Sequence, residues 1–297
     1  MKTLTFKKDG EWTLGVKTEG GILDVKEAVR LRMADTEGIP VTVDELILQG
    51  EKGKEALQRL ADTELASREG VFYPEDSLTL GPCVVSPQKI ICVGLNYKKH
   101  AEESNMALPE TPILFSKFSN ALAGHLQEVK IPERSLQVDY EVELGLVIGK
   151  TASKVEVDEA RNYVYGYCTA NDLSARDLQF KTGQWLLGKT CDGFSPAGPY
   201  LVSSDEIEDP NQLGLKTVLN GTVRQDSNTA DMVFSCEEII SYVSQHMTLY
   251  PGDLILTGTP EGVIMGEPDG ERFWLKDGDE VTVEVEGLGK LTTIMRK

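Results

Sequence analysis

The ten residues from Asp139 to Ile148 constrain the fold more than any other segment of the chain. Their alternating side chains predict a β-strand, because successive side chains of a strand point to opposite faces. One face would enter a core with Tyr140, Val142, Leu144, Leu146 and Ile148. The other face would carry Asp139, Glu141 and Glu143, three like charges that repel one another when buried. Such a strand needs either open solvent or a bound cation on its acidic face.

A second polar cluster supports the interpretation that a cation is bound here. Asn171-Asp172 follows an apolar strand candidate at 164–170, where a third oxygen ligand could lie. An isolated Glu-x-Glu is more often a solvated acidic face, and that alternative stays open here. The acidic face nevertheless ends at Gly145 instead of continuing as a mixed polar surface. Three carboxylates without a cysteine favour a hard divalent cation, such as Mg²⁺, Mn²⁺ or Ca²⁺.

A histidine and a glutamate follow the predicted buried strand at 89–95. In a helix, His100 and Glu103 would share one face at a spacing of three residues. A carboxylate beside an imidazole raises its basicity, which suits a general base acting on water. The alternative is a surface helix with an incidental ion pair. The chain has three histidines, so few candidates for such a base exist. The polar stretch 103–112 could form a lid.

Residues 183–190 match the P-loop pattern GxxxxGK[ST]. We do not interpret them as a nucleotide site, because the interior is bulky Trp-Leu-Leu and no strand–loop–helix context surrounds it. Lys189 remains of interest as a single cation among apolar residues, since burial would make it depend on an anionic partner.

Composition narrows the class of protein. The net charge of −18 argues against nucleic acid and against anionic membranes as partners. No apolar run is long enough for a membrane span, and the first residues contain no signal-peptide core. Five scattered cysteines without a CxxC pair favour reduced thiols and a cytoplasmic location.

The chain divides into two predicted parts. Residues 1–75 form a small α/β unit with strands at 4–6 and 12–16 and a capping box at Thr42 and Glu45. A second helix there is indicated by Ala56, Leu57, Leu60, Ala61 and Leu65. Residues 76–297 are β-rich, with further strands at 254–257 and 281–285 and helices at 155–163 and 235–246. Strands and helices do not alternate regularly, so we predict a predominantly β, α+β fold.

Several motifs of the chain resemble, in the same order, those of the fumarylacetoacetate hydrolase family of metal-dependent C–C bond enzymes. The resemblance extends from Lys89 to near the C-terminus. Its motifs are Gly94-x-Asn96-Tyr97-x-x-His100-x-x-Glu103, Asp139-Tyr140-Glu141-x-Glu143, Asn171-Asp172-x-Ser174-Ala175-Arg176-Asp177, Leu187-Gly188-Lys189, Pro251-Gly252-Asp253 and Thr257-Gly258-Thr259-Pro260-x-Gly262-Val263. The stretch 263–268 is less typical of the family, which leaves substrate selectivity open.

The resemblance implies a mixed β-roll and a set of residue roles. It implies that Mg²⁺ or Mn²⁺ is held by Glu141, Glu143 and Asp172. It implies that His100 and Glu103 form a lid pair that activates water, and that Lys189 neutralises a developing enolate. The positions that match substrate contacts are Arg176, Gln179 and Thr259. By analogy with related proteins we also expect a homodimer.

The function expected from these roles is metal-dependent cleavage of a C–C bond in a small anionic 2-oxo or 2,4-dioxo acid. Oxaloacetate decarboxylation and 2-oxo acid tautomerisation or isomerisation are alternatives, because all three reactions share one electrophilic site. A non-catalytic protein that binds a metal or metabolite ranks lower, since it would not need His100, Glu103 and Lys189 together.

Overall fold

The computed structural model of the chain describes residues 1–31, 38–62 and 70–297. Strands dominate it. The largest sheet runs in the order β4-β3-β2-β1-β13-β11-β10-β16-β5-β6, with β7 paired to β13. Its strands are β1 (Lys2–Lys8), β2 (Glu11–Thr18), β3 (Gly21–Asp24), β4 (Phe72–Tyr73), β5 (Ile90–Gly94), β6 (Ile113–Lys117), β7 (Leu122–Ala123), β10 (Val142–Ile148), β11 (Val164–Asn171), β13 (Ser195–Ser203) and β16 (Leu254–Leu256).

A second sheet lies beside the first and has the order β15-β14-β17-β18-β8. Its strands are β8 (Glu128–Lys130), β14 (Gly214–Leu219), β15 (Thr222–Asn228), β17 (Glu280–Val285) and β18 (Gly289–Arg296). A short pair joins β9 (Val138–Asp139) to β12 (Ser174–Ala175). The architecture confirms the predicted strand-rich α+β class.

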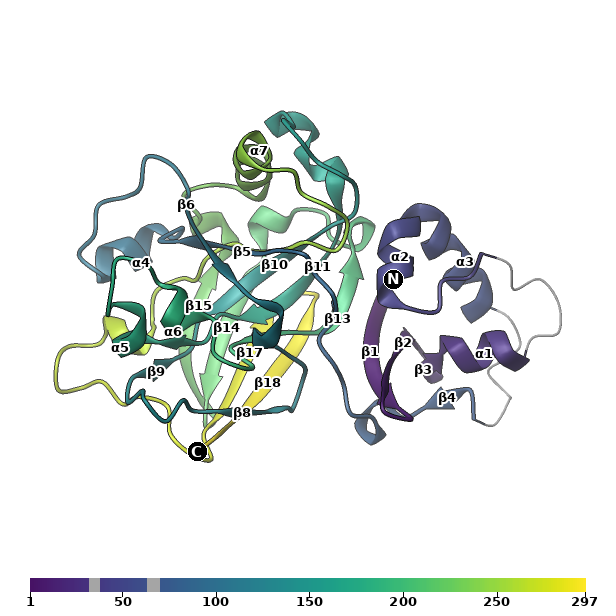
Figure 1. Cartoon of the computed structure of the whole chain (residues 1–297), viewed down its shortest axis with the longest axis horizontal. Helices are drawn as coiled ribbons and strands as arrows, with labels where there is room; N and C mark the ends of the chain where they lie inside the picture. Colours follow the sequence, from purple (N-terminus) through teal and green to yellow (C-terminus); the bar gives the residue numbers. More distant parts are fainter. Residues whose placement is uncertain (32–37, 63–69) are drawn as a thin grey trace.

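Helices are short and lie around the sheets (Figure 1). The α-helices are α1 (Val25–Leu31), α2 (Val43–Gln49), α3 (Glu51–Ala61), α4 (Lys98–Glu103), α5 (Arg176–Gln179), α6 (Leu186–Lys189) and α7 (Cys236–His246). The 3₁₀ turns are η2 (Glu75–Ser77), η3 (Ser119–Ala121), η4 (Val157–Tyr163), η5 (Ser204–Glu206), η6 (Pro210–Gln212), η7 (Thr229–Asp231) and η8 (Ile264–Gly266). No helix among the described residues is long and apolar enough to cross a membrane.

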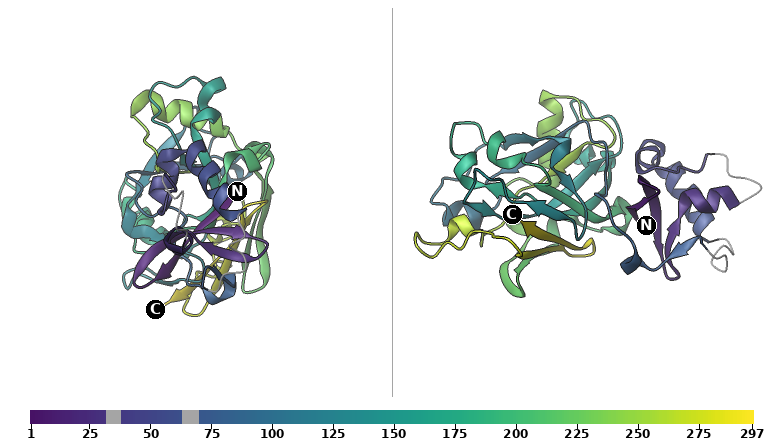
Figure 2. Two further views of the ribbon diagram at one scale, coloured as in Figure 1. Left: turned by 90° about the vertical axis from the view of Figure 1, so that its right-hand side faces the viewer. Right: turned by 60° about the horizontal axis from the view of Figure 1, so that its bottom comes forward.

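The N-terminal unit forms its own lobe, which Figures 1 and 2 show at one end of the molecule. It is joined to the rest through β1, where Lys2 pairs with Val202 and Thr3 with Leu201. The capping box of Thr42 and Glu45 is confirmed at the start of α2. The second predicted helix is α3, while Leu65 lies outside the described residues. The domain boundary after residue 75 stays a prediction.

The core explains why β10 is apolar from Leu144 to its end at Ile148. Leu144 and Leu146 of β10 pack in the cluster that contains Val283 of the second sheet. Val147 of the same strand points the other way, into a cluster with Cys168. A strand buried on both faces reads as a continuous apolar run.

Two expectations about local structure were wrong. The strand expected from Asp139 to Ile148 is interrupted, because β9 ends at Asp139 and β10 begins only at Val142. The chain changes partner there, from β12 to β11. The helix expected at 155–163 is instead the 3₁₀ turn η4, whereas the helix expected at 235–246 is α7 with a capping box of Ser235 and Glu238.

Candidate active site

A cavity of about 210 Å³ lies among α4, α5 and α6, at the end of the molecule away from the N-terminal lobe (Figure 1). Seven of the nine predicted site residues line it: His100, Glu141, Glu143, Arg176, Gln179, Lys189 and Thr259. The other two, Glu103 and Asp172, contact residues of this set directly. The fold thus gathers all the predicted site residues around one cavity.

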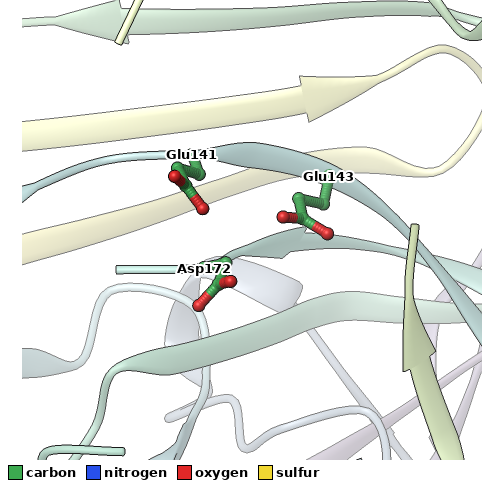
Figure 3. A group of neighbouring side chains, drawn as sticks. All are labelled: Glu141, Glu143 and Asp172. Atoms are coloured by element: carbon green, nitrogen blue, oxygen red, sulfur yellow. The ribbon is translucent and has the colours of Figure 1, made fainter. Parts of the chain in front are cut away.

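Three carboxylates meet at the floor of this cavity. One oxygen each of Glu141, Glu143 and Asp172 lies within 4.8 Å of the others, and all three residues are buried. Glu141 directly precedes β10 and Glu143 lies within it, while Asp172 follows the neighbouring strand β11 (Figure 3). The pairing of Val142 with Asn171 in these strands places the three side chains together. Because the acidic face is buried, the solvated alternative is wrong.

Buried cations surround the three carboxylates. The Lys189 ammonium donates to Glu141 Oε2 at 2.7 Å and to Asp172 Oδ2 at 2.8 Å. The Arg176 guanidinium donates to Glu141 Oε1 at 2.7 Å. By contrast, Glu143 forms no ion pair in the described part of the chain and accepts one hydrogen bond, from the backbone of Gly258 at 2.7 Å. One of the three carboxylates therefore lacks a cationic partner.

The pKa values reflect this asymmetry. Burial alone would raise the pKa of Glu141, but Lys189 and Arg176 outweigh it and lower that pKa to about 2. Burial raises the pKa of Glu143, and the charges of Asp172 and Glu141 raise it further. Burial opposes the charge on Lys189, yet Asp172 and Glu141 hold its pKa above the ordinary value. A divalent cation would relieve the repulsion around Glu143, so the donor set fits a metal such as Mg²⁺ or Mn²⁺.

The imidazole and carboxylate predicted to act as a pair lie together on α4. His100 Nδ1 is 3.2 Å from Glu103 Oε2, so Nε2 is the nitrogen that this contact leaves available. The His100 side chain is only 6% exposed and lines the cavity. Because Glu103 also reaches the backbone of Gly262 at 3.0 Å, the pair is part of a packed wall rather than an incidental surface contact.

The three predicted substrate contacts are held in place by their neighbours. Arg176 Nη1 donates to Gln179 Oε1 at 3.0 Å, and the same guanidinium contacts Asp139 and Glu141. Thr259 Oγ1 accepts from Gln225 at 2.9 Å. Arg176 therefore also links the carboxylates to one another, a role that the sequence did not indicate.

Two further features escaped sequence reasoning. Lys117 is completely buried and ion-pairs with Asp172, although no motif marked it. The cavity lining also contains an aromatic cluster, in which Trp185 lies edge-on to Phe115 at 5.3 Å and to Phe180 at 6.5 Å. The sequence marked Trp185 and its neighbours only as too bulky for a P-loop.

The fold brings a histidine–glutamate pair and a buried group of carboxylates to one cavity. Residues 89–296 match the family described as fumarylacetoacetate (FAA) hydrolase, C-terminal. The chain belongs to the fumarylacetoacetate hydrolase family and is an enzyme of it.

Known relatives and solved structures are similar to this chain over most or all of its length. The mitochondrial oxaloacetate tautomerase FAHD2A of Bos taurus is 43% identical over 91% of this chain and 82% of that protein. The fumarylacetoacetate hydrolase EaFAH of Exiguobacterium antarcticum superposes with a TM-score of 0.83 and 33% identity, over 100% of this chain and 99% of that one. A 5-carboxymethyl-2-hydroxymuconate delta-isomerase of Mycobacterium smegmatis superposes with a TM-score of 0.74 and 30% identity, over 100% and 98%. The cytoplasmic location and the homodimer stay predictions.

Proposed function

We propose that the protein is a Mg²⁺- or Mn²⁺-dependent enzyme that interconverts the keto and enol forms of a small 2-oxo acid, with oxaloacetate as the substrate to test first. The observation that carries the proposal is the His100–Glu103 pair, which faces Glu141 and Glu143 across one cavity. The name of the FAHD2A relative, which shares 43% identity with this chain, supports the choice of substrate. Tautomerisation thus takes precedence over the C–C bond hydrolysis that the sequence first suggested.

Glu141, Glu143 and Asp172 would hold the metal. When bound, the ion would act as a Lewis acid that polarises the 2-oxo group and makes the neighbouring C3 hydrogens more acidic. The cluster around it is close to balanced in charge, because the carboxylates Asp139, Glu141, Glu143 and Asp172 face the cations Lys117, Arg176 and Lys189. Addition of a divalent cation makes the site net positive, which favours an anionic substrate.

The reaction needs one proton removed and one added. His100 Nε2 would take a proton from C3 of the keto form, while Glu103 at Nδ1 stabilises the imidazolium that results. The C2 oxygen would gain a proton from solvent and His100 Nε2 would release its own to solvent, which completes the enol and restores the base. The Lys189 ammonium has three N–H groups, and the bonds to Glu141 and Asp172 use two of them. The third would donate to the C2 oxygen as negative charge develops there.

Hydrolysis of a 2,4-dioxo acid is the second candidate. The same imidazole can take a proton from water, which would then attack the distal carbonyl carbon. The C–C bond would break, and the pyruvate enolate that leaves would take the proton back from the imidazolium. The EaFAH structure, with a TM-score of 0.83, supports this candidate. Decarboxylation of oxaloacetate needs no attacking water, so His100 would be dispensable for it.

Product analysis distinguishes these reactions. Purified protein with Mn²⁺ or Mg²⁺ is offered oxaloacetate and acetylpyruvate, and the products are followed by NMR beside the ultraviolet decay of enol-oxaloacetate. Faster enol–keto exchange than with metal alone, without pyruvate, supports the tautomerase. Acetate with pyruvate from acetylpyruvate would favour the hydrolase, and pyruvate from oxaloacetate alone would favour the decarboxylase. Equal exchange rates with and without protein would refute the tautomerase.

A further inference from the structure

The segment Gly262–Gly266 lies between the carboxylate cluster and α4, and its backbone contacts both. It contains the single turn η8, and the Met265 side chain forms part of the cavity wall. In the sequence, Gly262 and Val263 belong to a family motif, whereas the stretch 263–268 is less typical of the family. Its contacts with Asp139 and with Glu103 of α4 fix how α4 lies against the cavity.

On its inner side, the segment is fixed by Asp139. The two carboxylate oxygens of Asp139 accept from the backbone N–H groups of Ile264 at 2.9 Å and Met265 at 3.0 Å. The same carboxylate accepts from Arg176 Nε at 3.0 Å, and Arg176 in turn contacts Glu141. Asp139 is completely buried, so these bonds are shielded from solvent.

Two further contacts fix the beginning of the segment. The Tyr140 hydroxyl donates to the Gly262 carbonyl at 3.1 Å. Gly262 itself has a φ of +95°, and a Cβ there would lie 2.3 Å from the Arg224 carbonyl oxygen. Only glycine fits both the conformation and the close approach. The backbone of the segment is thus held rigidly from one side.

On its outer side, the segment receives Glu103 of α4. The Gly262 N–H donates to Glu103 Oε1 at 3.0 Å, while Oε2 contacts His100. Gly266 packs directly against the same side chain, because a Cβ at this position would lie 2.2 Å from Glu103 Cδ and 2.3 Å from Oε1. Glu103 therefore occupies space that a side chain at residue 266 would need.

We propose that Gly262–Gly266 forms a fixed seat for Glu103, and that Gly266 is a positioning residue for the His100–Glu103 pair. The seat holds Glu103 at Nδ1 of His100 and thereby keeps α4 against the cavity. The proposal rests on the proposed function only for its effect on turnover, because the seating of α4 is a structural property that can be measured without substrate.

The test compares Gly266→Ala with Gly183→Ala. Both glycines have ordinary φ values, but a Cβ at Gly183 would meet nothing within 4 Å. The alanine at 266 meets the end of a flexible side chain, so Glu103 moves and the fold remains. Hydrogen exchange at the amides of 98–103 reports whether α4 stays seated. Mn²⁺ affinity, measured by titration calorimetry, reports whether the carboxylates are intact.

In Gly266→Ala we expect exchange in 98–103 to rise about 10-fold, Mn²⁺ affinity to change less than twofold and kcat to fall about 10–100-fold. Gly183→Ala should match the wild type in all three. Both changes should vanish when Gly266→Ala is introduced into Glu103→Ala, where the new Cβ has room. Wild-type exchange in Gly266→Ala, or an equal effect in the Glu103→Ala background, would overturn the proposal. Absence of turnover in the wild type would refute the proposed function and leave the exchange result valid.

Discussion

The ammonium of Lys117 and the carboxylate of Asp172 form an ion pair in which both side chains are completely buried. Lys117 also donates to the carbonyl oxygens of Leu173 and Phe194, so each of its three N–H groups has an acceptor. The other oxygen of Asp172 accepts from Lys189 at 2.8 Å. A ligand held between two lysines has its orientation set before any metal binds.

Replacement of Lys117 should therefore affect both stability and metal binding. In Lys117→Met, Asp172 loses one of its cationic partners in a buried environment, which we expect to lower the free energy of unfolding by about 3–5 kcal/mol. Mn²⁺ affinity should fall about 10–100-fold, as for other residues that orient a metal ligand. Urea unfolding and titration calorimetry measure the two effects.

Lys8→Met is the matched control for that variant. Lys8 pairs with the buried Asp24 at 2.6 Å in the N-terminal lobe, far along the sheet from the cavity. Its loss should reduce stability and leave Mn²⁺ affinity unchanged. Equal Mn²⁺ affinities for Lys117→Met and the wild type would contradict the role assigned to Lys117.

Glu143 should make the metal-free protein less stable as the pH rises. Burial, Asp172 and Glu141 raise the pKa of its carboxyl group above the ordinary value, so the folded state retains a proton that the unfolded chain has lost. Stability from this group is complete below about pH 4.5 and is lost as the pH rises through the raised pKa. Each unit of pKa difference corresponds to about 1.4 kcal/mol.

Glu143→Gln removes the titrating group but keeps an oxygen for the Gly258 N–H. With a chelator present, the variant should lose less stability between about pH 5 and pH 9 than the wild type, as measured by urea midpoints. Glu280→Gln, at an exposed position in β17, should retain the wild-type slope. An unchanged slope in Glu143→Gln would mean that Glu143 is already ionised in the metal-free protein.

The three carboxylates of the candidate metal site could be predicted from sequence because they lie in or directly beside two strands that pair. Glu141 directly precedes β10, Glu143 is its second residue and Asp172 directly follows β11, so antiparallel pairing of these strands brings the three together. The spacing of His100 and Glu103 on one helix face was predictable for the same reason. Contacts between residues close in sequence, or between residues of two paired strands, leave a periodic pattern that can be recognised in the sequence.

The remaining parts depend on long-range packing. Lys117 lies 55 residues before Asp172 and reaches it only because the large sheet carries β6 and β11 into one body. Asp139 shares its motif with the acidic residues but faces the backbone of Ile264, 125 residues later. The break in the strand at Tyr140 also has a tertiary cause, the change of partner from β12 to β11. Alternation along one segment carries no information about these partners.

His100 should be needed for turnover and not for metal binding. Its Nδ1 contacts Glu103, while its ring makes no contact with the metal-binding carboxylates in the described hydrogen bonds. His100→Asn should lower kcat for keto–enol exchange by about 10²–10⁴-fold. His246→Asn, at an exposed position at the end of α7, should leave kcat unchanged. Loss of Mn²⁺ affinity in His100→Asn would argue that the imidazole is a ligand rather than a base.

Glu141 gives the most direct test of the metal itself. Mn²⁺ that binds only the folded protein should raise the free energy of unfolding by about 2.7 kcal/mol at 100 times its Kd, and a chelator should reverse this. Glu141→Gln removes a ligand and the charge that Lys189 and Arg176 balance, so Mn²⁺ should no longer stabilise the variant. Glu284→Gln, which weakens only the surface pair with Lys290 at 3.8 Å, should respond to Mn²⁺ like the wild type. Stabilisation of Glu141→Gln to the same degree would place the metal elsewhere in the protein.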